Sequence, residues 1–104
     1  MKVAITASGN ELASKIDQRF GRCQYFALYD TATEKTEFVE NTAKDAPEGA
    51  GPAAVAIVAN RGAMKVVSGE FGFKIKTMLT DLGIQMVIMK EEKTVAEIIE
   101  LLNK

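Results

Sequence analysis

The residues best suited to chemistry lie in one stretch, 16–26, which reads IDQRFGRCQYF and holds the only cysteine of the chain. Cys23 follows Arg19 and Arg22, and guanidinium groups within a few ångströms of the sulfur would favour the thiolate. A thiolate is both a nucleophile and a soft metal ligand. The sequence therefore predicts an accessible Cys23 thiolate as the candidate metal ligand. The alternative is a small buried apolar side chain at the start of a strand, which is common for a free cysteine.

The chemistry available to this site is limited by what the chain lacks. It contains no histidine, so the usual general base and the commonest nitrogen ligand are missing. A single thiolate cannot hold a structural zinc or a cluster that needs four cysteines. A cluster would have to be bound loosely, bound between subunits, or received preassembled. Reversible oxidation of Cys23 is a further alternative, although no second cysteine is present to resolve it.

Two glycine-containing stretches form a second candidate site. The segments 49–52 (GAGP) and 68–72 (SGEFG) each place glycine beside an expected helix N-terminus, where exposed backbone N–H groups bind anions. The candidate residues are Gly49, Gly51, Gly69 and Gly72. Ordinary turn formation is the alternative interpretation. Neither stretch matches the dinucleotide-binding or P-loop patterns, which disfavours nucleotide binding.

Composition limits the class of protein. A length of 104 residues predicts a single domain, residues 1–104. Thirteen basic and fourteen acidic residues give a net charge of -1, so no global field attracts nucleic acid. No apolar run approaches the roughly 18 residues of a membrane span. One cysteine and no signal peptide predict a reducing, cytoplasmic setting, and we expect a monomer or a weak homodimer.

The pattern of apolar residues predicts the elements that must position these candidates. Strands are expected over 2–7, 24–30, 35–41, 64–68 and 84–89, and helices over 53–60, about 71–82 and from Thr94, where Glu97 would complete a capping box. The turn 31–34 would join an antiparallel hairpin, and the later alternation of helix and strand requires parallel strands. The expected fold class is α/β, three-layer, with a five-stranded mixed sheet. Ligands bind such sheets at the carboxyl ends of the parallel strands.

These residues resemble a known family. A KVAIT strand, the DQRFGRCQYF block, a GAGPAA helix start and a KVVSGEFG turn are similar to the dinitrogenase iron-molybdenum cofactor biosynthesis family. The resemblance implies a ribonuclease H-like fold without nuclease activity, and the segment 1–7 indeed carries no acidic residue. It also implies binding of iron–sulfur or iron-molybdenum cofactor precursors. The resemblance places these residues at the site: Asp17, Arg19, Phe20, Gly21 and Cys23, with 49–52 and 69–72 around them.

The leading hypothesis is a non-enzymatic carrier or chaperone for an iron–sulfur or iron-molybdenum type cluster. Cys23 would be the ligand, and Arg19 and Arg22 would neutralise cluster charge. Family members that bind cofactor often use histidine ligands, which this chain does not have. The expected partners are proteins that donate and accept the cluster. The alternative is a regulatory or interaction module that binds an anion or a partner protein without metal.

Overall fold

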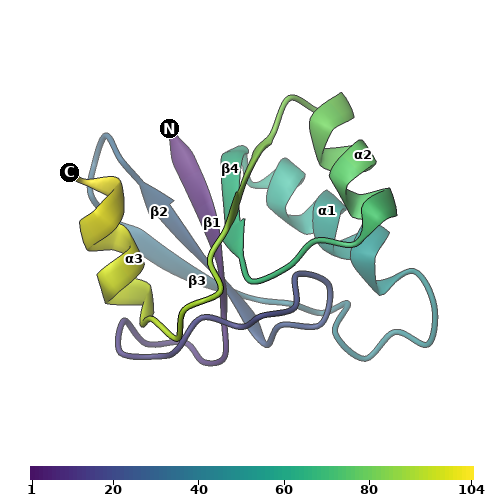
Figure 1. Cartoon of the computed structure of the whole chain (residues 1–104), viewed down its shortest axis with the longest axis horizontal. Coiled ribbons are helices and arrows are strands. Elements are labelled where there is room, and N and C mark those ends of the chain that lie inside the picture. The colour runs from purple at the N-terminus through teal and green to yellow at the C-terminus, as the bar shows by residue number, and fades with distance from the viewer.

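The computed structural model describes residues 1–104, which form one five-stranded sheet with three helices. The strands are β1 (Lys2–Ala7), β2 (Tyr25–Asp30), β3 (Thr36–Glu40), β4 (Ala63–Ser68) and β5 (Gln85–Ile88). The helices are α1 (Ala50–Asn60), α2 (Phe73–Asp81) and α3 (Val95–Leu102). The strands lie in the order β3-β2-β1-β4-β5 (Figure 1), which confirms the α/β class and the mixed sheet.

The sheet is antiparallel on one side of β1 and parallel on the other. β1 pairs antiparallel with β2, and β2 pairs antiparallel with β3 through the expected hairpin, in which Tyr29 lies opposite Thr36. β1 and β4 are parallel, as are β4 and β5. α1 supplies the crossover from β3 to β4, and α2 supplies that from β4 to β5. The carboxyl ends of β1 and β4 therefore meet at one edge of the sheet.

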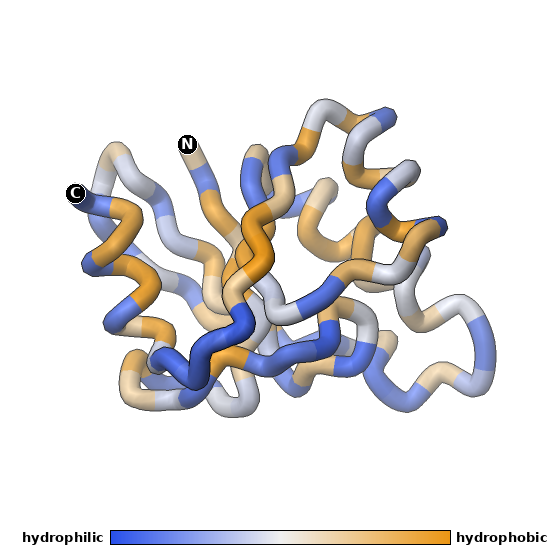
Figure 2. The backbone as a smooth tube through the Cα atoms, in the orientation of Figure 1, coloured by the Kyte–Doolittle hydropathy of each residue, from blue (hydrophilic) through white to orange (hydrophobic).

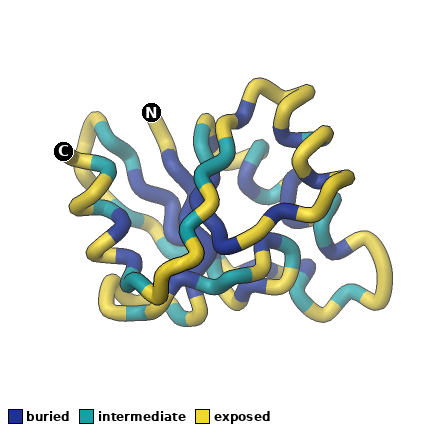
Figure 3. The backbone as a smooth tube through the Cα atoms, in the orientation of Figure 1, coloured by how far each residue is buried: buried dark blue, intermediate teal, exposed yellow.

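The sheet separates two apolar cores, so the domain has three layers. Along β1, Ala4 joins the core under α1 and α2, whereas Val3 and Ile5 join the core under α3. This alternation is the two-residue period of a strand buried on both faces. α1 and α2 accordingly cover one face and α3 the other (Figure 1), and the buried positions concentrate on the central strands (Figure 3).

Hydropathy follows the same division, since the apolar segments of the chain lie along the strands and the inner sides of the helices (Figure 2). α3 begins with the expected capping box: the Thr94 hydroxyl accepts from the N–H of Glu97, and the Glu97 carboxylate accepts from the N–H of Thr94. α1 begins earlier than expected, at Ala50, with Gly49 at φ +72° preceding it. No helix is both long enough and apolar enough to cross a bilayer.

Candidate functional site

The segment 17–22, called the site loop here, lies across the carboxyl ends of β1 and β4. The N–H of Asp17 donates to the carbonyl of Thr6, and the Thr6 hydroxyl donates to the carbonyl of Asp17 at 2.6 Å. The same hydroxyl lies 3.2 Å from the Ser68 hydroxyl, at the end of β4. Thr6 and Ser68 are fully buried, so these bonds fix the start of the loop from below.

On its α2 side the loop packs against the turn that precedes this helix. Arg19 pairs through its backbone with Glu70 in the manner of a parallel strand. A methyl group on Gly69 would lie 2.6 Å from the Cα of Gln18, a distance that real atoms do not adopt. Gly69 is therefore required because the two backbones touch. The sequence had suggested an exposed N–H donor at this position instead.

On its α1 side the loop touches the first turn of the helix. A methyl group on Gly21 would lie 3.1 Å from both the backbone N and the Cα of Gly51. A methyl group on Gly51 would in turn lie 2.6 Å from Cδ1 of Ile75, in the first turn of α2. The site loop and the first turns of α1 and α2 thus form one contiguous unit. Gly72 ends this unit as the residue before α2, with an extended backbone.

Phe20 supports the loop from beneath. Its side chain is buried, and its ring centroid lies 5.6 Å from that of Phe26 and 5.8 Å from that of Phe71. Aromatic pairs at these distances contribute more than their buried area alone. Phe20 belongs to the expected site, but its ring is directed into the core and supports the backbone of the loop.

The expectation of an accessible Cys23 thiolate is wrong for this structure. The side chain is fully buried, and its sulfur donates a hydrogen bond to the carbonyl of Phe20 at 3.3 Å. Burial, together with the nearby carboxylate of Asp17, raises the pKa of the thiol from 9.0 to about 12. The charge that acts on the thiol is thus an anion, whereas the sequence suggested arginine. Cys23 as a metal ligand stays a prediction, which the geometry of this conformation does not support.

Arg22 has a structural role that its spacing from Cys23 did not suggest. Its Nη1 donates to the carbonyls of Lys44 and Ala46, at 2.9 and 2.7 Å. The guanidinium thus ties the end of the site loop to the segment that leads into α1. The two arginines thus have different partners, and Arg19 is the one whose side chain is largely exposed at the rim.

Asn41 is the residue that the sequence analysis missed. Its side chain is fully buried, and Nδ2 donates to the carbonyls of Gly21 and Cys23 at 3.0 and 2.9 Å. Its Oδ1 accepts from the N–H of Ala43. An asparagine at the end of a strand usually indicates a turn, so no local signal distinguished this amide. Only the tertiary fold brings it beneath the site loop.

The rim formed by the site loop and the first turns of α1 and α2 offers backbone N–H groups and one exposed guanidinium, beside the carboxylates of Asp17 and Glu70. Neither helix has a side-chain cap or an acidic residue in its first turn, so their first backbone N–H groups are free of side-chain partners. The side chain of Arg19 is 59% exposed, and its Nε lies 3.5 Å from Oδ1 of Asp17. An exposed ion pair of this length leaves most of the guanidinium available to an anion.

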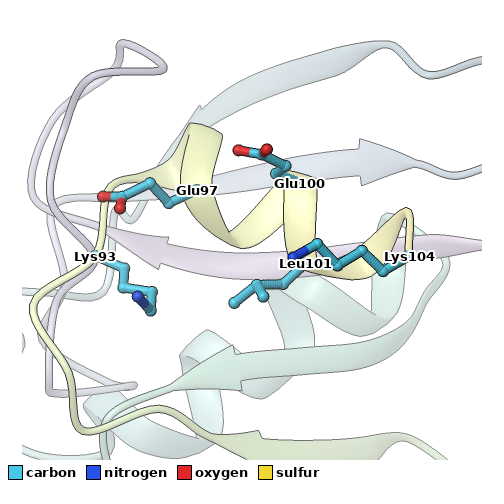
Figure 4. Close-up of a pocket in the computed structure, with 5 residues that line it drawn as sticks. All are labelled: Lys93, Glu97, Glu100, Leu101 and Lys104. Carbon is cyan, nitrogen blue, oxygen red and sulfur yellow. The ribbon is translucent and has the colours of Figure 1, made fainter.

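No cavity opens at this rim. One pocket of about 170 Å³ lies along α3 and is lined by Lys93, Glu97, Glu100, Leu101 and Lys104 (Figure 4). A second, of about 380 Å³, lies at the hairpin beside Lys2, Asp30 and Lys35. No three side chains of histidine, cysteine, aspartate or glutamate are grouped so that they could hold a metal ion. The rim can therefore bind an anion at its surface, through N–H groups and one guanidinium.

The sequence profile of the family described as dinitrogenase iron-molybdenum cofactor matches residues 1–104. The chain belongs to this family. The family assignment agrees with the DQRFGRC block and the two glycine turns, which are the parts of the chain that meet at the rim.

Solved structures with the same fold support the assignment to this dinitrogenase cofactor family. The apo form of the orange protein from Desulfovibrio gigas superposes with a TM-score of 0.91 at 32% identity, over 97% of this chain and 85% of that one. A candidate NifB protein from Thermotoga superposes with a TM-score of 0.84 at 34% identity, with the same coverage. In sequence, the chain is also 28% identical to an uncharacterized protein from Methanocaldococcus jannaschii, over 83% of this chain and 72% of that protein.

Replacing the buried amide should destabilise this member of the family and loosen its site loop. Asn41→Ala leaves two buried carbonyls and one N–H without partners, and we expect a loss of about 2 kcal/mol in the free energy of unfolding. Urea unfolding measures this loss. Asn10→Ala is the control, because Asn10 is exposed, and it should change the stability by less than about 0.5 kcal/mol. Equal stabilities of the two variants would contradict the role assigned to Asn41.

The raised pKa of Cys23 makes stability depend on pH in the alkaline range. Above about pH 9 an unfolded chain loses the thiol proton, whereas the native chain keeps it until about pH 12. The native state then binds more protons, so the free energy of unfolding should fall by about 1.4 kcal/mol per pH unit in this window.

Cys23→Ser removes this titration, and lysine ionisation is common to both proteins. The stability difference between wild type and Cys23→Ser should therefore be constant below about pH 8 and shift steadily in favour of the variant up to about pH 10.5. Urea unfolding at a series of pH values measures it. A difference that does not vary with pH would show that the thiol is not sealed in the native state.

Proposed function

We propose that this protein is a non-enzymatic carrier that binds an anionic iron–sulfur or iron-molybdenum type cluster at the rim and hands it on. The observation that carries the proposal is the convergence of two helix N-termini and an exposed arginine on one loop. The family to which the chain belongs supports the choice of cargo. The orange protein supports a binding role in general, since the name apo form describes a protein without its bound group.

The mode of binding follows from the donors that the rim offers. Because the Cys23 sulfur is buried and no histidine exists, the rim supplies neither a thiolate nor an imidazole ligand to iron. Backbone N–H groups at the starts of α1 and α2 and the Arg19 guanidinium can donate hydrogen bonds to bridging sulfides or to a carboxylate of the cargo. Binding through hydrogen bonds and charge leaves the metal coordination of the cargo unchanged. Release then breaks no metal–protein bond, as delivery to an acceptor protein requires.

The residues of the rim have distinct tasks in this proposal. Arg19 contacts the cargo, and Asp17 holds the guanidinium in place through its carboxylate and its bond to the N–H of Arg19. Gly21 and Gly51 allow the loop and α1 to approach. Asn41 and Arg22 attach the loop to the segment between β3 and α1. The partners would be one protein that supplies the cluster and one that accepts it.

A second candidate function is a module that binds a simple anion, without any metal. The absence of a grouped set of metal-ligating side chains favours it. The same N–H groups would donate hydrogen bonds to phosphate or to a carboxylate. Competition separates the two. Phosphate should displace a bound cluster only weakly if the cluster is the cargo. If the rim is a general anion site, phosphate should bind with the same affinity as the cluster.

Anaerobic titration with isolated iron-molybdenum cofactor and with a preassembled [4Fe–4S] cluster tests the carrier function, with visible absorption as the readout. Arg19→Ala should weaken binding about tenfold, because a charge-assisted hydrogen bond is lost. Arg61→Ala is the matched control, since Arg61 pairs with Glu37 on β3, away from the rim. Cys23→Ser should bind as wild type does. Failure of the wild-type protein to bind either cluster would refute the carrier function.

The same titration decides whether Cys23 becomes a ligand by local opening of the site loop. In that case Cys23→Ser would abolish binding and Arg19→Ala would have the smaller effect. Equal weakening by Arg19→Ala and Arg61→Ala would instead indicate non-specific attraction to positive charge, and the rim would then not be the site.

A further inference from the structure

Phe73 is the most exposed large apolar side chain of the protein. It is the first residue of α2, and 87% of its surface is in contact with solvent. The other exposed large apolar residues lie between 43% and 56%. An aromatic ring left in water is unfavourable, and aromatic residues are frequent anchors of protein interfaces. The position of Phe73 is not explained by the packing of the domain.

The surroundings of Phe73 carry positive charge. Between residues 71 and 80 the charged side chains are Lys74 and Lys76, both exposed, with no carboxylate among them. The N-terminus of α2 adds the positive end of a helix without a side-chain cap. α2 lies on the outer flank of the molecule (Figure 1), and its outward positions are exposed (Figure 3). An apolar anchor thus lies beside two exposed lysines, between Glu70 and Asp81, on a surface that another molecule can reach.

We propose that Phe73, Lys74 and Lys76 form the docking surface for a partner protein that presents an apolar socket edged by carboxylates. The ring would enter the socket, and the lysines would pair with the carboxylates around it. Aromatic anchors surrounded by complementary charge give affinity at the centre of an interface and orientation at its rim.

A flat anionic membrane fits this surface less well. Glu70 is exposed three residues before Phe73 and would be pressed against the same negative charge. A folded partner can place a neutral or basic group opposite Glu70 and carboxylates opposite the lysines. A protein therefore fits the mixed charge better than a uniform anionic surface does.

A second copy of this chain also fits poorly. In a two-fold symmetric dimer centred on this patch, Lys74 and Lys76 of both copies would be brought together. Head-to-tail contact with a different face of the second copy would leave one patch open in every pair and would continue as a ring or a filament. The charge of the patch therefore favours a different, acidic protein.

Docking at Phe73 would bring the partner against the rim. Phe73 follows Gly72 directly, and Glu70 is paired with Arg19 of the site loop. The inference itself needs no cluster, and its test uses the protein without one. Its failure and the failure of the carrier function are therefore separate results.

The test replaces Phe73 with the photo-crosslinking residue p-benzoylphenylalanine in cells of the source organism. The matched control carries the same residue in place of Leu82, which follows the C-terminal end of the same helix and is 56% exposed. Irradiation should link one protein at position 73 that is absent at position 82. That protein is then purified, and its affinity for the wild-type chain is measured by calorimetry at two salt concentrations.

With the purified partner, Phe73→Ser should weaken binding by about tenfold or more, whereas Leu82→Ser should change it by less than about twofold. The double variant Lys74→Glu/Lys76→Glu should also weaken binding and should reverse its dependence on salt, because salt screens the new repulsion between carboxylates. Thermal unfolding should be unchanged in all these variants, because the replaced side chains are exposed. This control separates lost docking from lost folding.

Four outcomes would overturn the proposal. The first is the same set of crosslinked proteins at positions 73 and 82. The second is a crosslinked product consisting of two copies of this chain, with a matching mass in sedimentation. The third is binding of the wild type, but not of Phe73→Ser, to vesicles of phosphatidylglycerol and phosphatidylcholine. The fourth is a purified partner whose affinity is unaffected by Phe73→Ser.

Discussion

The geometry of the rim depends on one buried side-chain amide. Asn41 satisfies two carbonyls of the segment 21–23 and one N–H of its own turn, so it joins the end of β3 to the site loop. It thereby supports Gly21 at the place where the loop lies against Gly51 of α1. Buried polar networks of this kind specify one arrangement because their disruption leaves polar atoms without partners. The exposed groups of the rim are positioned from inside the protein.

The fold was predictable because its signals are local and agree with one another. The hairpin at 31–34, the helices after Pro52 and Thr94, and the apolar strands each have a short-range pattern, and the connection lengths then fix parallel pairing. The start of α1 was placed three residues late, since Pro52 was taken as the first turn although Gly49 makes the entry. Element ends depend on individual backbone angles, which composition does not determine.

The meeting of the candidate site residues was predictable, but the directions of their side chains were not. The family block and the glycine turns meet at the carboxyl ends of β1 and β4, as the topology requires. The roles within it were different, because the direction of a side chain depends on packing. Cys23 points into the core beside Phe20, and Arg22 turns to the carbonyls of Lys44 and Ala46. Adjacency in sequence therefore did not place guanidinium and sulfur together.

The contact between the residues before the site loop and the start of α3 has a consequence for local unfolding. The N–H of Ile16 donates to the carbonyl of Lys93, and the N–H groups of Val95 and Ala96 donate to the carbonyls of Ser14 and Leu12. These bonds join two segments that are far apart in the sequence, so they exist only while α3 is docked on the sheet. Undocking of α3 would remove the support of the loop on that side, and slow amide hydrogen exchange at 93–96 and in the loop would therefore be lost together.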